Sequence, residues 1–392
     1  MKQRLDGLAV FRELLKDGAV AAFRELLQDC CRNDADNFVS HCGEFESLLF
    51  QQSDCWTAYL RRAVMESENV CIRNWASGAV TAVQEECLNR ELVFLDRLSQ
   101  VTLDDLTAGL DHAPDFLVGW RTEGGSIAQD YRQRMQEVGE KGYGIFARYH
   151  MFTVENGQLV PVKHPDPQQL EQLPGYEQER QKVIANTQAL LDGKPANNVL
   201  LYGDAGTGKS SAIKAIANNF AEQGLRLVEV KKNQLYQIPD LIDALAANPL
   251  KFILFIDDLS FTSNDDNFAA LKAILEGSVG GHAQNIAVYA TSNRRHLIKE
   301  TMTDRSGDDI HESDTRQELM SLSARFGLTV TFASPDRDRY LYIVGELAKQ
   351  YGVDLDEHTL AVRSEAFAIR MGGRSARVAK QFIELCKSGV QV

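Results

Sequence analysis

One eight-residue segment, Gly203–Ser210, constrains the fold of this chain more than any other part of its sequence. It reads GDAGTGKS and fits the pattern G-x-x-x-x-G-K-[ST] at every fixed position. The apolar run VLLY precedes it and the amphipathic run SSAIKAIANNF follows it, which predicts a strand, a loop and a helix in that order. With both flanking elements present, the pattern favours a phosphate-binding loop in an α/β fold over a chance glycine-rich turn.

The chemistry expected of this loop follows from its backbone. Its glycines let successive N–H groups point at phosphate oxygens, and the helix that follows adds its positive N-terminal end. Lys209 is expected to reach the β- and γ-phosphates of ATP, and the Ser210 hydroxyl is expected to coordinate Mg²⁺. We therefore expect ATP or ADP to contact Gly203, Asp204, Ala205, Gly206, Thr207, Gly208, Lys209, Ser210 and Ser211.

Polar residues at the ends of two later apolar strands complete the expected site. In KFILFIDD, Asp257 is expected to hold Mg²⁺ through water and Asp258 to polarise the attacking water. In IAVYATSNRR, Asn293 is expected to bond the γ-phosphate or that water, with Thr291 and Ser292 as weaker candidates. The alternatives are a solvated turn for the two aspartates and a loop-capping role for Asn293.

Three arginines are candidates for neutralising charge on the γ-phosphate. Arg325 lies in SLSARFG, and Arg374 and Arg377 lie in GGRSARVAK, where Ser375 is the expected N-cap of the last helix. From spacing alone, each arginine could equally form a surface salt bridge.

The second half of the chain alternates strands and helices, which predicts a parallel sheet covered on both faces. The segment 301–318 is polar and acidic and is expected to be a mobile loop. The expected strands are 198–203, 226–230, 252–257, 286–291 and 328–333. The expected helices are 176–192, 209–223, 239–247, 266–276, 336–351, 356–371 and 375–388.

The rest of the chain gives a less specific signal. Residues 1–150 show apolar residues at helical spacing and predict an all-α domain, in which Trp56, Trp75 and Trp120 are expected in the core or an interface. Residues 151–175 predict a hairpin around Asn156-Gly157 and then an extended linker. The expected division is therefore 1–150, 151–175, an α/β core at 176–333 and a helical domain at 334–392.

Composition limits the partners and the compartment. The net charge is −13 and both halves are acidic, so broad sequence-independent binding to nucleic acid is not favoured, although a local basic patch stays open. The seven cysteines lack metal-ligand spacing and are expected to be reduced thiols. Because no signal peptide and no apolar run of about eighteen residues occurs, we expect a cytoplasmic protein with no membrane contact.

These motifs, in this order, resemble the AAA+ superfamily over residues 170–392. ARFGLTVTFASPDRDRYLYIV resembles the arginine-finger box of bacterial replication initiators and helicase loaders. A closer resemblance is to a bacterial AAA+ family that is catalogued as a domain of unknown function. Three segments carry this resemblance: LPGYEQERQKVIANTQALLDGKPANNVLLYGDAGTGKSS, FIDDLSF and TSNRRHL. That resemblance reaches back to about Gly142.

The resemblance implies a five-stranded parallel sheet with the P-loop strand at its centre and a lid formed by the last three helices. It implies that Arg325 acts in trans in a neighbouring subunit of a homo-oligomer, and that Arg377 is the lid arginine, with Arg374 as the alternate. It places Leu173, Pro174 and Tyr176 in the adenine pocket. Asp258 stands where many AAA+ motors have Glu, which makes slow turnover of ATP more plausible.

Three functions are consistent with this pattern. The first is an oligomeric ATPase that remodels or assembles a protein client held by residues 1–150. The second is an ATP-dependent switch in DNA metabolism, resembling an initiator or a helicase loader, which the acidic composition disfavours. The third is a nucleotide-binding scaffold with weak catalysis. KKNQLYQIPD carries Tyr236 without the flanking pattern of a translocating pore loop, which disfavours threading of a client.

Overall fold

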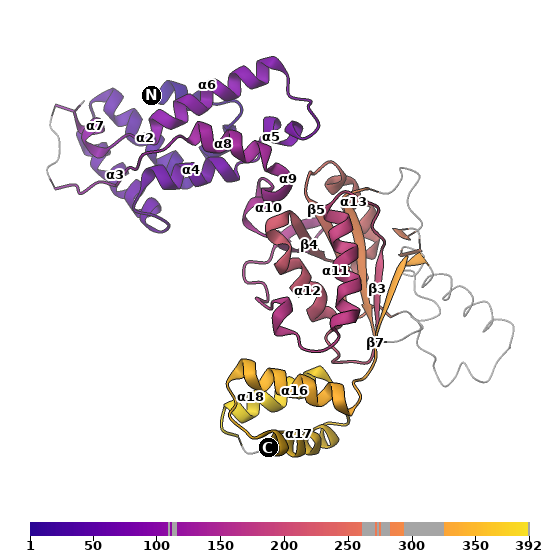
Figure 1. Ribbon diagram of the computed structural model, residues 1–392. Coiled ribbons are helices and arrows are strands. Elements are labelled where there is room, and N and C mark those ends of the chain that lie inside the picture. The colour runs from indigo at the N-terminus through magenta and orange to yellow at the C-terminus, as the bar shows by residue number, and fades with distance from the viewer. Residues whose placement is uncertain are drawn as a thin grey trace. The chain divides into compact units, whose positions relative to one another are not determined.

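The computed structural model of the protein describes residues 1–108, 110–111, 116–260, 271–272, 274–275, 283–293 and 325–390. The chain divides into two compact units, Met1–Arg148 and Tyr149–Val392 (Figure 1). Most of the helix expected at 266–276 and the whole loop expected at 301–318 lie outside the described residues. Among the residues that are described, no helix combines the length and the apolar character needed to cross a bilayer.

In the described residues of the first unit the regular elements are all helices, and one isolated β-bridge joins Cys55 to Arg121. Amphipathic helices turn their apolar faces toward a shared interior, as the spacing of their apolar residues predicts. Its elements are α1 (Lys2–Asp6), η1 (Arg12–Lys16), α2 (Gly18–Arg32), α3 (Ala35–Phe50), α4 (Trp56–Glu66), α5 (Val70–Trp75), α6 (Ala82–Leu98), α7 (Leu103–Thr107), α8 (Ile127–Gln136), α9 (Val138–Lys141) and α10 (Ile145–Arg148).

Aromatic side chains form the centre of this unit. Trp56 stacks on Phe23 with ring centroids 4.6 Å apart, and Trp120 packs edge-on against Phe45 at 4.7 Å. Trp56 and Trp120 are therefore core residues, as expected. Trp75 differs, because it lies at the end of α5 and is 38% exposed.

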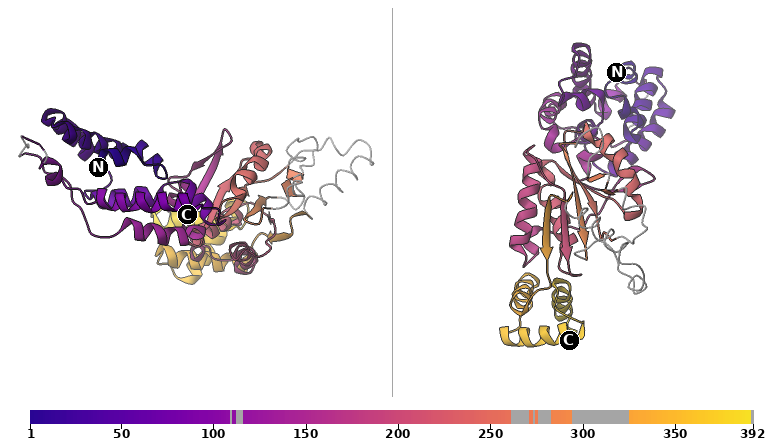
Figure 2. Two further views of the ribbon diagram at one scale, coloured as in Figure 1. Left: turned by 90° about the horizontal axis from the view of Figure 1, so that it is seen from above. Right: turned by 90° about the vertical axis from the view of Figure 1, so that its right-hand side faces the viewer.

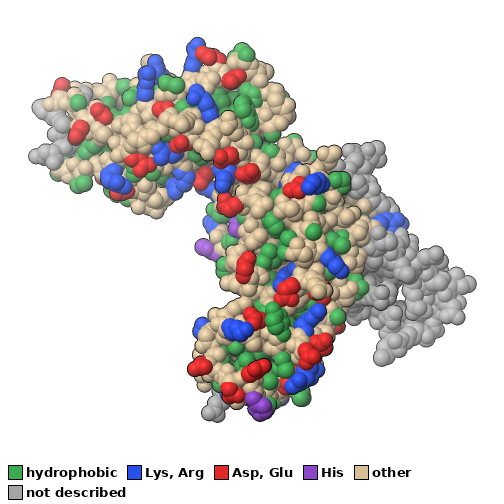
Figure 3. All heavy atoms as spheres, viewed as in Figure 1, with side chains coloured by type: hydrophobic (Ala, Val, Ile, Leu, Met, Phe, Trp, Pro, Cys, Tyr) green, Lys and Arg blue, Asp and Glu red, His purple; other side chains and the backbone are tan. Residues whose placement is uncertain are grey.

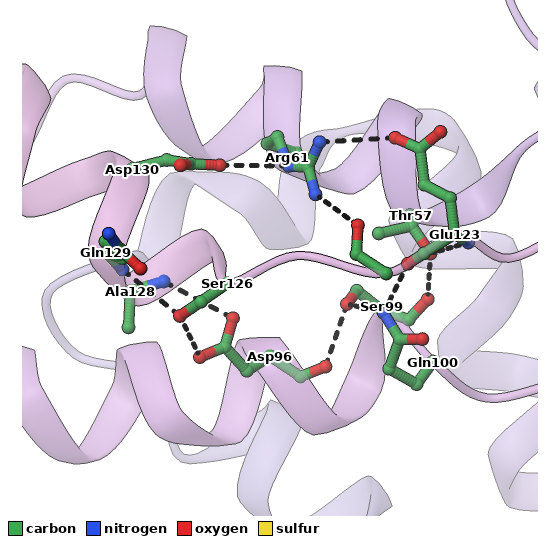
Figure 4. Close-up of polar contacts among 11 residues, drawn as sticks. Thr57, Arg61, Asp96, Ser99, Gln100, Glu123, Ser126, Ala128, Gln129 and Asp130 are labelled. Carbon is green, nitrogen blue, oxygen red and sulfur yellow. Dashed lines mark hydrogen bonds and ion pairs between the residues drawn. The ribbon is translucent and has the colours of Figure 1, made fainter.

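Polar contacts fix the loop that leads into α8 (Figure 4). Arg61 of α4 forms ion pairs with Glu123 of the loop and with Asp130 of α8, each at 3.2 Å. Asp96 of α6 accepts a hydrogen bond from the Ser126 hydroxyl at 3.0 Å. These side chains thus tie the loop to α4 and α6, and tie α4 to α8.

The second unit is built on one seven-stranded sheet with the order β2-β1-β4-β5-β6-β3-β7. Six of these strands are mutually parallel: the five expected strands and β1, while β2 is antiparallel to β1. The sheet is thus larger than predicted by two strands at one edge. The strands are β1 (Met151–Glu155), β2 (Gln158–Pro161), β3 (Val199–Gly203), β4 (Leu225–Glu229), β5 (Lys251–Ile256), β6 (Ile286–Ser292) and β7 (Leu328–Phe332).

The two additional strands are the predicted hairpin. Asn156 and Gly157 both have positive φ, 51° and 77°, which suits a two-residue turn between antiparallel strands. The sequence predicted a hairpin and then a linker over residues 151–175, separate from the α/β core, whereas β1 pairs in parallel with β4 of that core. Met151, Phe152 and Val154 are buried, so this strand extends the core of the sheet.

The P-loop strand does not lie at the centre of the sheet as expected. β3 lies between β6 and β7, next to the edge strand. α11 (Glu177–Leu191) and α12 (Lys209–Asn219) cover the face in front of the sheet in Figure 1, and the third helix, α13 (Ile238–Ala246), contacts β6. Short 3-10 helices occupy Leu170–Gln172, Ala221–Gln223 and Lys232–Gln237.

Three helices follow β7 and pack on one another, as predicted for a lid: α16 (Arg337–Tyr351), α17 (Glu357–Arg370) and α18 (Ala376–Lys387) (Figure 2). The predicted apolar face of α16 is buried, including Tyr340 and Ile343. Ser375 accepts a hydrogen bond from the Val378 N–H and is the N-cap of α18, as predicted.

Candidate nucleotide-binding site

The P-loop connects β3 to α12, and its glycines are required by close contacts. Gly203 has φ 141°, and a Cβ at this position would overlap the carbonyl oxygen of Phe332 in β7. Gly206 has φ 79°, and a Cβ there would lie 3.1 Å from both the Arg377 Cβ and the Ser375 Oγ of the lid. The loop therefore fits between the sheet and the lid only because these positions carry no side chain.

Lys209 is buried at the first position of α12. Its Nζ donates to the carbonyl oxygens of Gly203 and Asp204, at 2.8 and 2.7 Å, and to Oδ1 of Asn293 at 3.0 Å. Burial lowers the pKa of this ammonium, while the nearby carboxylates, Asp204 foremost, oppose the shift. The lysine is thus held at the inner surface of the loop by three acceptors.

The two aspartates and Asn293 meet because neighbouring parallel strands end side by side. Ile256 of β5 pairs with Ala290 of β6, so the residues that follow each strand lie at the same edge of the sheet. The Asn293 Nδ2 donates to Oδ1 of Asp258 at 2.7 Å. Since Asn293 also accepts from Lys209, it connects the P-loop lysine to the second aspartate.

The first aspartate pairs with the P-loop serine. The Ser210 hydroxyl donates to Oδ1 of Asp257 at 2.6 Å. A hydroxyl and a carboxylate side by side form an all-oxygen donor set, which suits Mg²⁺. Ser210 and Asp257 are therefore the residues that would hold this ion.

These groups line a cavity of about 560 Å³. The P-loop and the ends of β5 and β6 contribute Ala205, Gly206, Thr207, Gly208, Lys209, Ser210, Ser211, Asp257, Asp258, Thr291 and Asn293. The remaining lining comes from the segment before α11, from α11 itself, from the end of β7 and from the lid: Gln168, Gln172, Leu173, Pro174, Tyr176, Arg180, Phe332, Ile343, Leu347, Ala376, Arg377 and Lys380.

Tyr176 shapes the apolar part of this cavity. It has φ 61°, and its ring stacks on Phe332 with centroids 5.2 Å apart. Its hydroxyl donates to the Ala333 carbonyl oxygen at 2.6 Å, and the Arg339 guanidinium lies 4.8 Å from the ring centroid. Burial raises the pKa of Tyr176 to about 12, so the phenol stays neutral. Tyr176 therefore contributes neutral, largely apolar lining to the cavity.

The lid arginines have different surroundings. Arg377 lines the cavity, and its backbone N–H donates to the Gly206 carbonyl oxygen at 3.0 Å. Arg374 instead makes two hydrogen bonds to Glu365 of α17, at 2.9 and 2.6 Å, and is not among the lining residues. The structure therefore favours Arg377 over Arg374 as the cavity arginine.

Three further predicted site residues, Gly203, Asp204 and Arg325, are not among those that line the cavity. The Asp204 carboxylate accepts from the N–H and the hydroxyl of Ser334, at 2.9 and 2.7 Å, and these bonds lower its pKa. Arg325 precedes β7, whose Val330 pairs with Leu201 and whose Phe332 pairs with Gly203. Because β3 and β7 are parallel, Arg325 lies at the end of the sheet opposite the P-loop.

Sequence reasoning missed several residues of the cavity. Lys380 lies three residues after Arg377 on α18, and that helical spacing could have pointed to it. Arg180 lies within α11 and donates to the Gly175 carbonyl oxygen. Gln168 and Gln172 had no recognisable signal, because they precede the first helix of the α/β core, the one in irregular chain and the other at the end of a short 3-10 helix.

Comparison with known proteins gives a family match and partial likenesses to solved structures, among them the following two. A RuvB mutant from Thermotoga maritima has 18% identity and a TM-score of 0.37; the match covers 55% of this chain and 63% of that one. The AAA domain of FIGL-1, in complex with ADP, has 18% identity and a TM-score of 0.39; the match covers 55% of this chain and 72% of that one. No curated protein matches.

The family match covers the hairpin, the sheet and the lid. Residues 146–390 match the family described as "Protein of unknown function (DUF815)". The match takes in more than half of the chain and all the cavity residues named above. The protein is therefore a member of the DUF815 family, and the matched residues form an α/β core followed by three packed helices.

Proposed function

We propose that this protein binds ATP together with Mg²⁺ at the P-loop cavity and hydrolyses it. The observation that carries the proposal is the chain of hydrogen bonds from Lys209 through Asn293 to Asp258. These bonds connect the P-loop lysine, through Asn293, to the Asp258 carboxylate that lines the same cavity. A loop that merely binds phosphate has no need of a carboxylate held in that position.

Each group has a distinct task in this proposal. The backbone N–H groups of the P-loop bind the phosphates, and Lys209 exchanges one of its present acceptors for a phosphate oxygen. Asn293 orients the Asp258 carboxylate, which accepts a hydrogen bond from the attacking water and aligns it. Mg²⁺ held by Ser210 and Asp257 would supply positive charge against the phosphates.

The position of Arg325 supports a homo-oligomer. Strand β7 contains five residues and is about 16 Å long. Arg325 lies before its first residue, whereas the P-loop begins at Gly203, which pairs with its last residue, Phe332. We propose that Arg325 acts on the γ-phosphate bound by a neighbouring copy, because its own cavity lies at the other end of the sheet.

We propose that the first unit binds a protein client. Its own buried core, built around Phe23, Phe45 and Trp56, supports an independent binding module. On the face seen in Figure 3, Lys and Arg side chains are interspersed with Asp and Glu on both units, which favours a protein client over a nucleic acid. An ATPase assay with and without DNA separates the two, since stimulation by DNA supports the switch in DNA metabolism.

The direct test measures nucleotide binding and phosphate release for three variants. Lys209→Ala is expected to abolish detectable ATP binding, and Asp258→Asn to retain binding while turnover falls at least about 100-fold. Lys194→Ala, which removes an exposed lysine paired with Asp192, is the matched control and should behave as wild type. Undetectable turnover in the wild type, with binding intact, would leave only the scaffold function.

A further inference from the structure

Thr291 is a buried residue that touches both aspartates of the site. It is the sixth residue of β6 and is 1% exposed. The pairing of Ile256 with Ala290 sets it beside Asp257, at the end of the neighbouring strand. The sequence considered it only as a weaker substitute for Asn293, in contact with phosphate or water.

Its hydrogen bonds indicate a different role. The Thr291 hydroxyl donates to Oδ1 of Asp257 at 2.6 Å and accepts from the backbone N–H of Asp258 at 2.9 Å. Its carbonyl oxygen accepts from the Leu259 N–H at 2.7 Å. One residue of β6 thus holds three successive residues that follow β5.

The middle residue of this segment has an unusual backbone. Asp258 has φ 51°, a conformation that few non-glycine residues adopt without support from their surroundings. Its N–H is shared between the Thr291 hydroxyl and Oδ1 of Asp257, the latter at 3.1 Å. The hydroxyl therefore supports the turn that directs the Asp258 carboxylate toward Asn293.

The same hydroxyl also orients the first aspartate. Oδ1 of Asp257 receives the hydroxyls of Ser210 and Thr291, both at 2.6 Å. Two donors on one oxygen fix the rotation of the carboxylate and leave its second oxygen available to other partners. A residue needed only for packing in a buried strand would not require a hydroxyl, since valine has the same shape.

We propose that Thr291 is a positioning residue of the ATPase site, which holds Asp257 for the metal and Asp258 for the water. This inference rests on the proposed function. Its removal should therefore weaken the response to Mg²⁺ and slow turnover, while the binding of nucleotide without metal stays unchanged. Partners that orient metal ligands are typically worth about 10- to 100-fold in metal affinity or activity.

The test measures ADP affinity by calorimetry, once with Mg²⁺ and once with a chelator, and steady-state ATPase rates. For Thr291→Val we expect unchanged affinity in chelator, a half-saturating Mg²⁺ concentration raised about tenfold, and kcat lowered about 10- to 100-fold. Thr291→Ser keeps the hydroxyl and should return both quantities to within about threefold of wild type. Thr291→Ala provides a second hydroxyl-free variant if the valine does not fold.

Thr187→Val is the matched control, because Thr187 is also fully buried in this unit and its hydroxyl bonds to Val183 and Tyr289 at 2.9 Å, outside the cavity. It should leave the Mg²⁺ dependence unchanged even if it lowers the melting temperature. An unaltered Mg²⁺ dependence and kcat in folded Thr291→Val protein would overturn the inference but leave the proposed function standing. Failure of the wild type to bind ADP would refute both.

Discussion

At the scale of single residues, the first unit depends on one buried carboxylate. Glu91 of α6 is 8% exposed, and it accepts the backbone N–H groups of Ala9, Val10 and Phe11 at 2.6, 3.2 and 2.9 Å. These groups lie in the chain between α1 and η1, where no helix supplies partners for them. The carboxylate therefore holds the N-terminal segment on α6.

Glu91→Ala should lower the free energy of unfolding of the first unit by at least about 3 kcal/mol, because three N–H groups lose a charged acceptor. All three tryptophans of the chain lie in this unit, so their fluorescence during urea unfolding reports its stability. The exposed Glu86, which pairs with Arg90, gives a control: Glu86→Ala should change stability by less than about 0.5 kcal/mol. Equal effects of the two changes would contradict this account.

A histidine makes the stability of the same unit depend on pH. The His41 Nδ1 lies 2.6 Å from Oδ2 of the buried Asp29, and this hydrogen bond is the main cause that raises the pKa of His41 above 6.5. The folded-state pKa of His41 is higher than its unfolded-state pKa. The His41–Asp29 hydrogen bond therefore contributes its full stabilisation below about pH 6.5, and this stabilisation is lost as the pH rises through the folded-state pKa. The stability difference between wild type and His41→Gln should thus be larger at pH 6 than at pH 9 in urea unfolding, and a difference independent of pH would contradict it.

At the scale of elements, the P-loop is hydrogen-bonded to the lid and to the connector before it. Asp204 accepts twice from Ser334, which lies between β7 and α16, and Gly206 accepts from the first turn of α18. A shift of the lid must therefore break bonds to the loop that binds phosphate. Under the proposed function, these bonds would couple nucleotide binding to the position of the three lid helices.

Removal of the connector bonds should weaken nucleotide binding without disrupting the P-loop. Asp204→Ala loses both contacts to Ser334, but Lys209 bonds only to the backbone of Asp204, so the phosphate cradle remains. We expect ADP affinity to fall about tenfold, since hydrogen bonds to charged groups contribute about 1.5–3 kcal/mol each. Ser334→Ala removes one of the two bonds and should show a smaller loss by calorimetry. Affinity unchanged in both variants would mean that the connector does not assist binding.

At the scale of the whole molecule, the proposed role of Arg325 makes hydrolysis depend on the assembly of at least two subunits. Arg325→Ala should retain ATP binding and lose hydrolysis. Asp258→Asn should have the same two effects, because the attacking water is no longer aligned. A mixture of the two proteins should recover part of the activity, because some shared sites then contain both an intact Asp258 and an intact Arg325. If no mixing ratio yields more activity than the separate variants, Arg325 does not act between subunits.

The sequence by itself was sufficient for features that depend on local spacing. GDAGTGKS predicts the phosphate-binding loop because its glycines, lysine and serine are close together in the sequence. Asp257, Asp258 and Asn293 can be recognised because each follows an apolar strand. The hairpin at Asn156-Gly157 and the N-cap at Ser375 are equally local.

Only the tertiary structure decided which distant residues meet. It placed β1 beside β4, β3 next to the edge strand, and Glu365 against Arg374, which leaves Arg377 at the cavity. It also brought Lys380, Gln172 and Thr291 to the same cavity. These outcomes depend on the order of the strands and on contacts between side chains of separate elements. The free energy of such contacts depends on how the elements pack, which the spacing of residues along the chain does not determine.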